Sequence, residues 1–163
     1  MGKLYLLCGK PGCGKTTLAS CLKEKFGMIH FSADDFMLKL FGEIEDRQVF
    51  DEKLRACKEV IYKLCEQLLD YKDIVLDFGF WTREERESVK KEFKNRDVVF
   101  VYLKKDDDVI FNQISKRNEN LKENEYYIDK NTYDILSSKF EWPEEDENMI
   151  IYTNLNDFLK YVE

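Results

Sequence analysis

Short apolar runs recur along the chain, with enough sequence between them for a helix. The first run, Leu4 to Cys8, is followed by a glycine. A continuous run of this kind is typical of a strand that is buried on both faces of a parallel sheet. The other runs are Met28 to Phe31, Ile74 to Leu76 with Asp77 at the end, Val98 to Leu103, and Met149 to Tyr152.

The segments between these runs carry apolar residues at helical spacing. Thr16 to Phe26 places Leu18, Ala19 and Leu22 on one face, and a second helix is expected from Glu52 onward. Alternating strands and helices predict a three-layer α/β/α fold with a five-stranded parallel sheet, whose ligands bind at the carboxyl ends of the strands. The length of 163 residues suits a single domain, 1–163, and the polar stretch 115–127 is interpreted as a mobile lid.

Composition narrows the classes of partner. The formal net charge is -7 and no stretch gathers Lys and Arg alone, which argues against a general nucleic-acid-binding surface. Five scattered cysteines and a single histidine indicate free thiols in a reducing compartment and no usual zinc site. The N-terminal apolar run is too short to span a membrane, so we expect a cytoplasmic protein.

The sequence GKPGCGKT, from Gly9 to Thr16, matches the phosphate-binding pattern GxxxxGK[ST] between an expected strand and an expected helix. Its backbone N–H groups and the helix N-terminus would cradle phosphates, Lys15 would reach the terminal phosphates, and Thr16 would ligate Mg²⁺. This motif predicts the P-loop NTPase fold, with a nucleoside triphosphate and Mg²⁺ as ligands, and leaves ATP or GTP open. The residues expected to hold the nucleotide are Gly9, Gly12, Cys13, Gly14, Lys15, Thr16 and Thr17.

Carboxylates follow two of the expected strands. Asp34 and Asp35 come just after the second run, and Asp77 closes the third. A carboxylate beside the γ-phosphate can accept the proton of an attacking hydroxyl, which is kinase chemistry. One of the pair Asp34 and Asp35 could instead cap a helix, and the sequence does not say which of them is the base.

With these motifs, the chain resembles the small P-loop kinases of the AAA_33 type, akin to chloramphenicol phosphotransferase, zeta toxins and the kinase domain of polynucleotide kinase. The resemblance rests on GKPGCGKTT, SADD, VLDFGFWTREER, ISKRN and FEWPEEDE, which together extend over nearly the whole chain. It implies that Asp34 is the general base, Asp77 an acceptor-side carboxylate, and Arg117 a lid arginine that meets the transferring phosphate. Related kinases often carry two arginines in the lid, whereas here Asn118 follows Arg117.

The resulting interpretation is an ATP- and Mg²⁺-dependent kinase that phosphorylates a hydroxyl of a small molecule. Expected contacts of the acceptor are Asp35, Phe36, Asp77, Trp81 and Arg86, and the acidic surroundings favour a neutral or cationic acceptor. One alternative is a polynucleotide or nucleoside 5'-hydroxyl kinase. Another is a nucleotide-dependent switch, although the chain lacks the NKxD motif with which GTPase switches recognise guanine. The acceptor's identity and the oligomeric state stay open.

Overall fold

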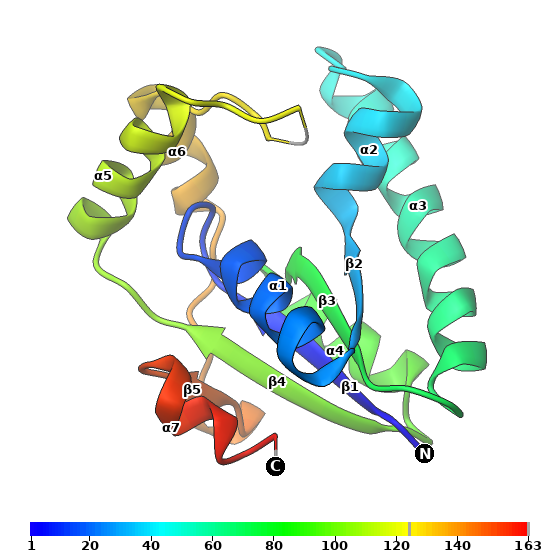
Figure 1. Ribbon diagram of the computed structural model, residues 1–163. Helices are drawn as coiled ribbons and strands as arrows, with labels where there is room; N and C mark the ends of the chain where they lie inside the picture. Colours follow the sequence, from blue (N-terminus) through cyan, green and yellow to red (C-terminus); the bar gives the residue numbers. More distant parts are fainter. Residues whose placement is uncertain (124, 163) are drawn as a thin grey trace.

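A five-stranded parallel sheet forms the centre of the computed structural model, which describes residues 1–123 and 125–162 (Figure 1). The strand order is β2-β3-β1-β4-β5, and each neighbouring pair is parallel. The strand that precedes the glycine loop therefore lies in the middle of the sheet. The strands are β1 (Lys3–Cys8), β2 (Ile29–Ser32), β3 (Ile74–Gly79), β4 (Asp97–Leu103) and β5 (Ile150–Tyr152).

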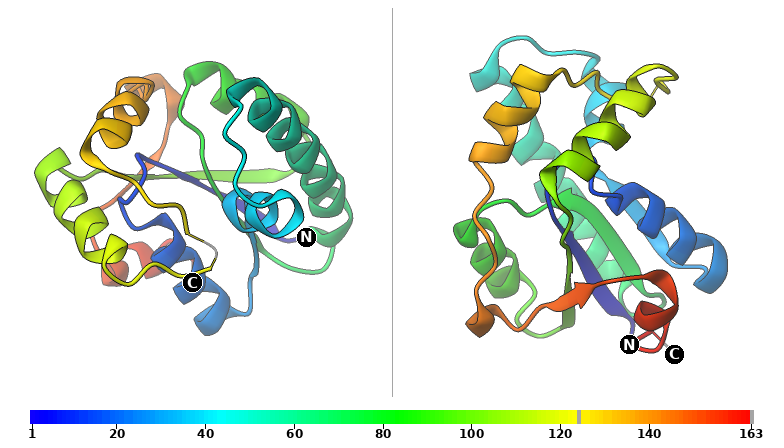
Figure 2. Two further views of the ribbon diagram at one scale, coloured as in Figure 1. Left: turned by 90° about the horizontal axis from the view of Figure 1, so that it is seen from above. Right: turned by 90° about the vertical axis from the view of Figure 1, so that its left-hand side faces the viewer.

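Helices cover both faces of this sheet, and two pairs of helices extend beyond its carboxyl edge on opposite sides of the loop (Figures 1 and 2). The pair α2 and α3 follows β2, and the pair α5 and α6 follows β4. The glycine loop lies between the two pairs. The helices are α1 (Lys15–Phe26), α2 (Ala33–Phe41), α3 (Arg47–Leu68), α4 (Arg83–Glu92), α5 (Asp107–Asn118), α6 (Lys130–Ser138), the 3-10 helix η1 (Glu145–Glu147) and α7 (Leu155–Leu159).

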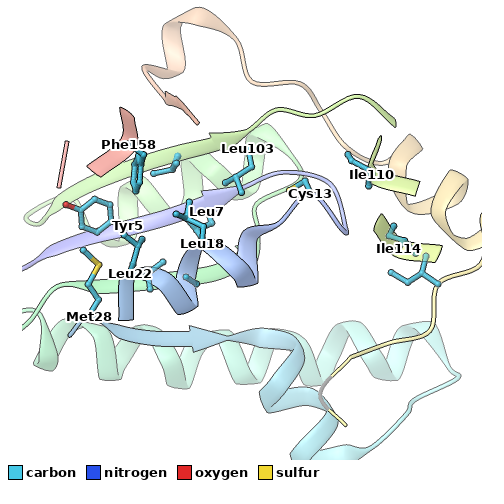
Figure 3. Packing of buried hydrophobic residues seen from close by; sticks show 14 of the residues in the cluster. Tyr5, Leu7, Cys13, Leu18, Leu22, Met28, Leu103, Ile110, Ile114 and Phe158 are labelled. Atoms are coloured by element: carbon cyan, nitrogen blue, oxygen red, sulfur yellow. The ribbon is translucent and has the colours of Figure 1, made fainter. Parts of the chain in front are cut away.

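Two apolar cores lie on the two faces of the sheet, and β1 contributes to both. Tyr5 and Leu7 point to the core that contains α1 and α7, shown in Figure 3. Leu4, Leu6 and Cys8 point to the core that contains α3 and α4. Because every side chain from Leu4 to Cys8 is fully buried, the continuous apolar run of the sequence is explained.

The predicted fold class is confirmed: the chain is a three-layer α/β protein with five parallel strands. Most boundaries lie within one residue of the expected ones, and the two larger differences concern β3 and α3. β3 continues past Asp77 to Gly79, and α3 begins at Arg47, where the Asp46 side chain accepts a hydrogen bond from the Val49 amide. Within the described residues no helix is long and apolar enough to cross a membrane.

Candidate functional site: a phosphate loop facing three carboxylates

The glycine loop has the backbone conformation that its sequence predicts. Gly12 and Gly14 have positive φ angles of 78° and 103°, where side chains are disfavoured. A Cβ on Gly12 would lie 2.4 Å from Cγ1 of Ile114, so the loop also packs directly on α5. Gly14 occupies the N-cap of α1 without a side-chain cap, which leaves the helix N-terminus facing the loop.

Lys15 folds back over the loop. Its Nζ donates hydrogen bonds to the carbonyl oxygens of Gly9 at 3.0 Å and Lys10 at 2.8 Å. Burial acts to lower the pKa of Lys15, but Cys13 and the carboxylates Asp77 and Asp34 outweigh it, and the pKa is raised. The side chain therefore stays an ammonium ion at the position where a phosphate would sit.

Cys13 and Thr17 differ in their surroundings. The Cys13 side chain is fully buried in the core on the α1 face, so only its backbone can face the loop. Thr17 is exposed on the first turn of α1. A nucleotide contact from Cys13 would thus come from its amide.

Asp77 lies directly behind the loop. Thr16 donates from Oγ1 to Oδ2 of Asp77 at 2.5 Å, and Nε2 of His30 lies 4.0 Å from the same oxygen. Burial lowers the pKa of His30 more than the nearby Asp77 raises it, so the imidazole is neutral at physiological pH. The strand pairing explains the geometry, because Ser32 at the end of β2 is in register with Asp77.

Asp34 and Asp35 occupy the first turn of α2. The helix is capped by Ser32, whose hydroxyl accepts a hydrogen bond from the Asp35 amide at 3.3 Å, so the interpretation of an aspartate as the cap is wrong. Asp35 pairs with Lys39 at 3.4 Å on the outer side of the helix. The cap thus leaves the Asp34 carboxylate free of a capping role.

Asp34 is exposed, yet enough protein surrounds its carboxylate to desolvate it. Desolvation and the charge of Asp77 raise the pKa of Asp34, while the cations Lys15 and Arg117 act in the opposite direction. Carboxylates from α2 and β3 therefore share one electrostatic environment with the lysine of the loop.

Arg117 reaches the same environment from the opposite wall, near the end of α5. Its Nη2 donates to the carbonyl oxygen of Tyr126 at 3.0 Å, and its Nε is buried without a partner among the described residues. The expected lid, 115–127, forms the end of α5 and the segment after it; within that range Asn124 lies outside the described residues. The segment extends from α5 toward α2, over the loop (Figure 1).

Two aromatic residues expected to contact the acceptor, Phe36 and Trp81, pack at the ends of β2 and β3, in what we call the acceptor wall. Phe36 packs edge-on against Phe31, with ring centroids 6.1 Å apart, and both lie against the core on the α3 face. Trp81 packs on Gly79, where a Cβ would lie 2.4 Å from the indole Nε1. These aromatic side chains are half-buried and form apolar packing at the ends of β2 and β3.

Arg86 does not reach this wall. Its side chain is 1% exposed and forms a two-pronged ion pair with Glu147, from Nε at 2.6 Å and from Nη2 at 2.9 Å. Its Nη1 donates to backbone carbonyls of Phe80, Trp81 and Glu141. The structure thus gives Arg86 a structural position that holds the C-terminal loop against α4, in place of the expected acceptor contact.

The polar pair Lys58 and Glu85 is a feature of the wall that sequence reasoning missed. Lys58 Nζ on α3 lies 3.0 Å from Oε1 of Glu85 on α4, and its charge acts on Asp34. Glu85 also closes a capping box with Thr82 at the start of α4. No local signal could have found the pair, because its members lie on different helices.

Lys10 of the glycine loop connects the loop to α5 and α6. Lys10 Nζ pairs with Oδ1 of Asp107 at 2.7 Å, Tyr133 donates to the same oxygen at 2.7 Å, and the Lys10 ammonium lies 4.9 Å above the Trp142 ring. Asp107 thus anchors the loop, whereas Asp106, the N-cap residue of α5, makes no side-chain cap. An open depression of about 680 Å³ lies outside this link, between α5 and α6.

Thr16 and Asp77 present a hydroxyl and a carboxylate oxygen, the hard oxygen ligands that Mg²⁺ prefers. Among the described residues, no group of three or more His, Cys, Asp or Glu side chains could hold a metal ion. Mg²⁺ commonly uses one or two protein oxygens together with water and substrate phosphates. The residues present therefore fit a phosphate-bound Mg²⁺ better than a dedicated protein cage.

Comparison with known proteins places this geometry in context. A curated relative, an adenylate kinase of Corynebacterium aurimucosum, is 31% identical over 103 residues, which are 58% of this chain and 57% of the relative. The chain therefore spans little more than half the length of that relative.

Solved structures share the fold at low sequence identity. A proposed kinase of Chloroflexus aurantiacus superposes with a TM-score of 0.74 at 15% identity, covering 99% of this chain and 93% of that one. A gluconokinase of Sinorhizobium meliloti superposes with a TM-score of 0.66 at 14% identity, and the match covers 98% of this chain and 87% of the gluconokinase. A chain of the Pnkp1/Rnl/Hen1 RNA repair complex superposes with a TM-score of 0.66 at 19% identity, and the match covers 85% of this chain and 43% of that one.

A family model described as an AAA domain, AAA_33, matches residues 4–143. The match runs from β1 through the glycine loop, the three carboxylates and Arg117 to the aromatic cluster around Trp142. It thus includes every residue of the candidate site and most of the chain. The chain belongs to the AAA_33 family of AAA domains.

Proposed function

We propose that the protein is an ATP- and Mg²⁺-dependent kinase that transfers the γ-phosphate to a hydroxyl of a small molecule. The observation that carries the proposal is that Thr16 of the loop bonds Asp77 at 2.5 Å, while Asp34 lies exposed in the first turn of α2 and interacts electrostatically with Lys15, Asp77 and Arg117. A phosphate-binding lysine, a carboxylate base and an arginine around one space are the components of phosphoryl transfer.

Each side chain has a distinct task in this reaction. Lys15 and the loop amides bind the β- and γ-phosphates, and Thr16 contributes its hydroxyl oxygen to the metal site beside Asp77. Bound Mg²⁺ would neutralise charge on the phosphate oxygens. Asp34 orients the acceptor hydroxyl and accepts its proton as the hydroxyl oxygen bonds to the γ-phosphorus.

The bond from the γ-phosphorus to the β,γ-bridging oxygen breaks in the same event, and ADP leaves. Arg117 stabilises the negative charge on the equatorial oxygens. A base with a raised pKa suits this task, because a more basic carboxylate takes the proton more readily. Asp34, rather than Asp35, is the proposed base, since Asp35 is already paired with Lys39.

The adenylate kinase and gluconokinase names of the relatives support a kinase with a small acceptor. An RNA 5'-hydroxyl acceptor has the RNA repair complex in its favour. The net charge of -7 and the acidic residues around Asp34 weigh against it, because polyanions bind through Lys and Arg. A nucleotide-dependent switch would hydrolyse or bind ATP without any acceptor.

The test is acceptor-dependent ADP formation. We expect the purified protein to release ADP from MgATP only when a hydroxyl acceptor is added from a panel of sugars, polyols, aminoglycosides, nucleosides and 5'-hydroxyl oligonucleotides. The variant Asp34→Asn should bind ATP with unchanged affinity and lose about 100-fold or more of the turnover. Unchanged turnover in Asp34→Asn would exclude Asp34 as the base, and ADP release independent of every acceptor would favour the switch.

A further inference from the structure

Tyr126 connects the two walls of the site. It follows α5 in the chain, and its ring meets the ring of Phe50 on α3 edge-on, with centroids 6.4 Å apart and an interplanar angle of 69°. Figures 1 and 2 show the segment that carries it running from α5 to the vicinity of α2. The side chain thus spans the space between the arginine wall and the acceptor wall.

The Tyr126 hydroxyl is buried and makes no hydrogen bond to any described residue. A hydroxyl shielded from water without a partner costs free energy, and such groups are usually satisfied in the native state. The aromatic contact with Phe50 positions the ring, while the hydroxyl oxygen has no hydrogen-bond partner among the described residues. The Tyr126 hydroxyl is therefore available to form a hydrogen bond with a ligand.

Its neighbours define what that ligand can be. Desolvation, then the charges of Asp34 and Glu43, raise the pKa of Tyr126 to about 12, so the phenol is protonated and can donate. The backbone carbonyl of Tyr126 also accepts the 3.0 Å hydrogen bond from Arg117. One residue thus holds the arginine through its carbonyl oxygen and carries a protonated phenol on which the charge of Asp34 acts.

We propose that Tyr126 is an acceptor-binding residue whose hydroxyl bonds a second oxygen of a neutral polyhydroxylated acceptor, such as a sugar or sugar alcohol, while Asp34 takes the reacting hydroxyl. The inference rests on the proposed function. The carboxylates Asp34 and Glu43, whose charges act on Tyr126, accept hydrogen bonds from hydroxyls and repel acceptors that carry a carboxylate or phosphate.

A pair of tyrosine variants isolates this contact. Tyr126→Phe keeps the ring and its packing on Phe50 and removes only the hydroxyl. Tyr127→Phe is the matched control, because the neighbouring Tyr127 is 63% exposed. Thermal unfolding by circular dichroism of both variants establishes that each is folded.

The probes are glucose, xylitol and sorbitol, with their deoxy analogues, and with glucosamine and gluconate as cationic and anionic counterparts. For the neutral polyol that is used best, Tyr126→Phe should raise KM about tenfold, the effect of one lost hydrogen bond at a desolvated site. The KM for ATP should not change, and Tyr127→Phe should match the wild type. For the analogue that lacks the bonded hydroxyl, Tyr126→Phe and the wild type should have equal KM values.

Calorimetry of the same probes with a non-hydrolysable ATP analogue separates this inference from the proposed function. Binding that weakens in Tyr126→Phe without any turnover would support Tyr126 and overturn the kinase. Turnover with equal KM values in both proteins, or a preference for gluconate or glucosamine, would overturn the inference alone. Neither binding nor turnover of any probe would overturn the inference, and the proposed function would fall with it only if no acceptor of the full panel above supported ADP release.

Discussion

Thr16 donates a 2.5 Å hydrogen bond from Oγ1 to Oδ2 of Asp77, which joins the first turn of α1 to the end of β3. The loop is fixed to the same strand a second time, because the Gly9 amide donates to the Gly79 carbonyl at 3.1 Å. Hydroxyl and carboxylate are therefore held together before any ligand arrives, and preorganised groups cost less to use in binding or catalysis.

The first prediction concerns Thr16→Ala. In the wild type, Mg²⁺ should increase ATP affinity, because the Thr16 oxygen completes the metal site. In Thr16→Ala this gain should be largely lost, while affinity measured in EDTA should stay the same. Titration calorimetry with and without EDTA measures both values; an equal Mg²⁺ effect in both proteins would exclude Thr16 as a ligand.

The second prediction concerns the pH dependence of stability at Asp34. Its pKa is raised in the folded state, so between the unfolded value and the folded value the native protein binds more protons than the unfolded chain. The contribution of Asp34 to stability is therefore present at low pH and falls as pH rises through its folded pKa. In Asp34→Asn the free energy of unfolding should not show this decrease with pH, so the variant should be more stable than the wild type at pH 7. Urea unfolding of both proteins at pH 4 and pH 7 measures the difference. Parallel pH profiles of the two proteins would contradict the shift.

The third prediction compares two glycines with positive φ. At Gly12 the added Cβ of alanine would collide with Ile114, whereas at Gly42 nothing lies within 4 Å of it. Gly42→Ala should cost only backbone strain, about 1–3 kcal/mol, because Gly42 has φ 68° and ψ -157°. Gly12→Ala should cost clearly more and should also reduce ATP affinity, since the loop must move off α5. Thermal unfolding and ATP titration of the two variants check this, and equal stabilities would show that the loop yields without cost.

The fourth prediction concerns the buried pair of Arg86 and Glu147. Glu147→Gln leaves a buried guanidinium without its counter-charge and should destabilise the protein by about 3–5 kcal/mol in urea unfolding. Arg83→Gln, which removes a surface network with Glu87, Glu144 and Asp146, should destabilise the protein far less, because water and salt screen exposed ion pairs.

The hydrogen bonds from Arg86 lower the pKa of Glu147, so its contribution is full above the unfolded carboxyl pKa and is lost as pH falls through the folded value. The free energies of unfolding of Glu147→Gln and Arg83→Gln should therefore differ less at pH 3 than at pH 7. Equal costs of Glu147→Gln and Arg83→Gln at pH 7 would rule out the buried pair as a stabilising contact.

The fifth prediction uses two helix N-caps. Thr82 accepts from the Glu85 amide at 3.1 Å, whereas Asp106 makes no side-chain cap on α5. Thr82→Ala should cost about 1 kcal/mol, and Asp106→Ala about half of that or less. Chemical denaturation of both variants is the measurement, and a larger loss in Asp106→Ala would contradict the assignment of the caps.

The sheet, its helices and the loop could be predicted from the sequence because each depends on local pattern. The run from Leu4 to Cys8 is buried on both faces of the sheet. Thr82 and Glu85 form the capping box of α4 within four residues of sequence. The loop conformation follows from glycines at positive φ. In these places short-range chemistry and the final structure agree.

What the sequence could not provide are contacts between distant residues. Arg86 follows an aromatic stretch and was expected at the acceptor, but its partner Glu147 lies in the C-terminal loop. Ser32 caps α2 in place of an aspartate, and local preference alone does not decide between neighbouring cap candidates. Tyr126 stands in a polar stretch without periodicity, and only the tertiary contact with Phe50 brings it near Asp34.

The strand order β2-β3-β1-β4-β5 has an evolutionary consequence. The loop that holds the triphosphate grows from the central strand, whereas α2 and α3 follow the edge strand β2. Substitutions on α2 and α3 that spare Asp34 leave the hydrogen bond from the Gly9 amide to the Gly79 carbonyl intact. The outer helices can therefore diverge without disturbing the loop on the central strand.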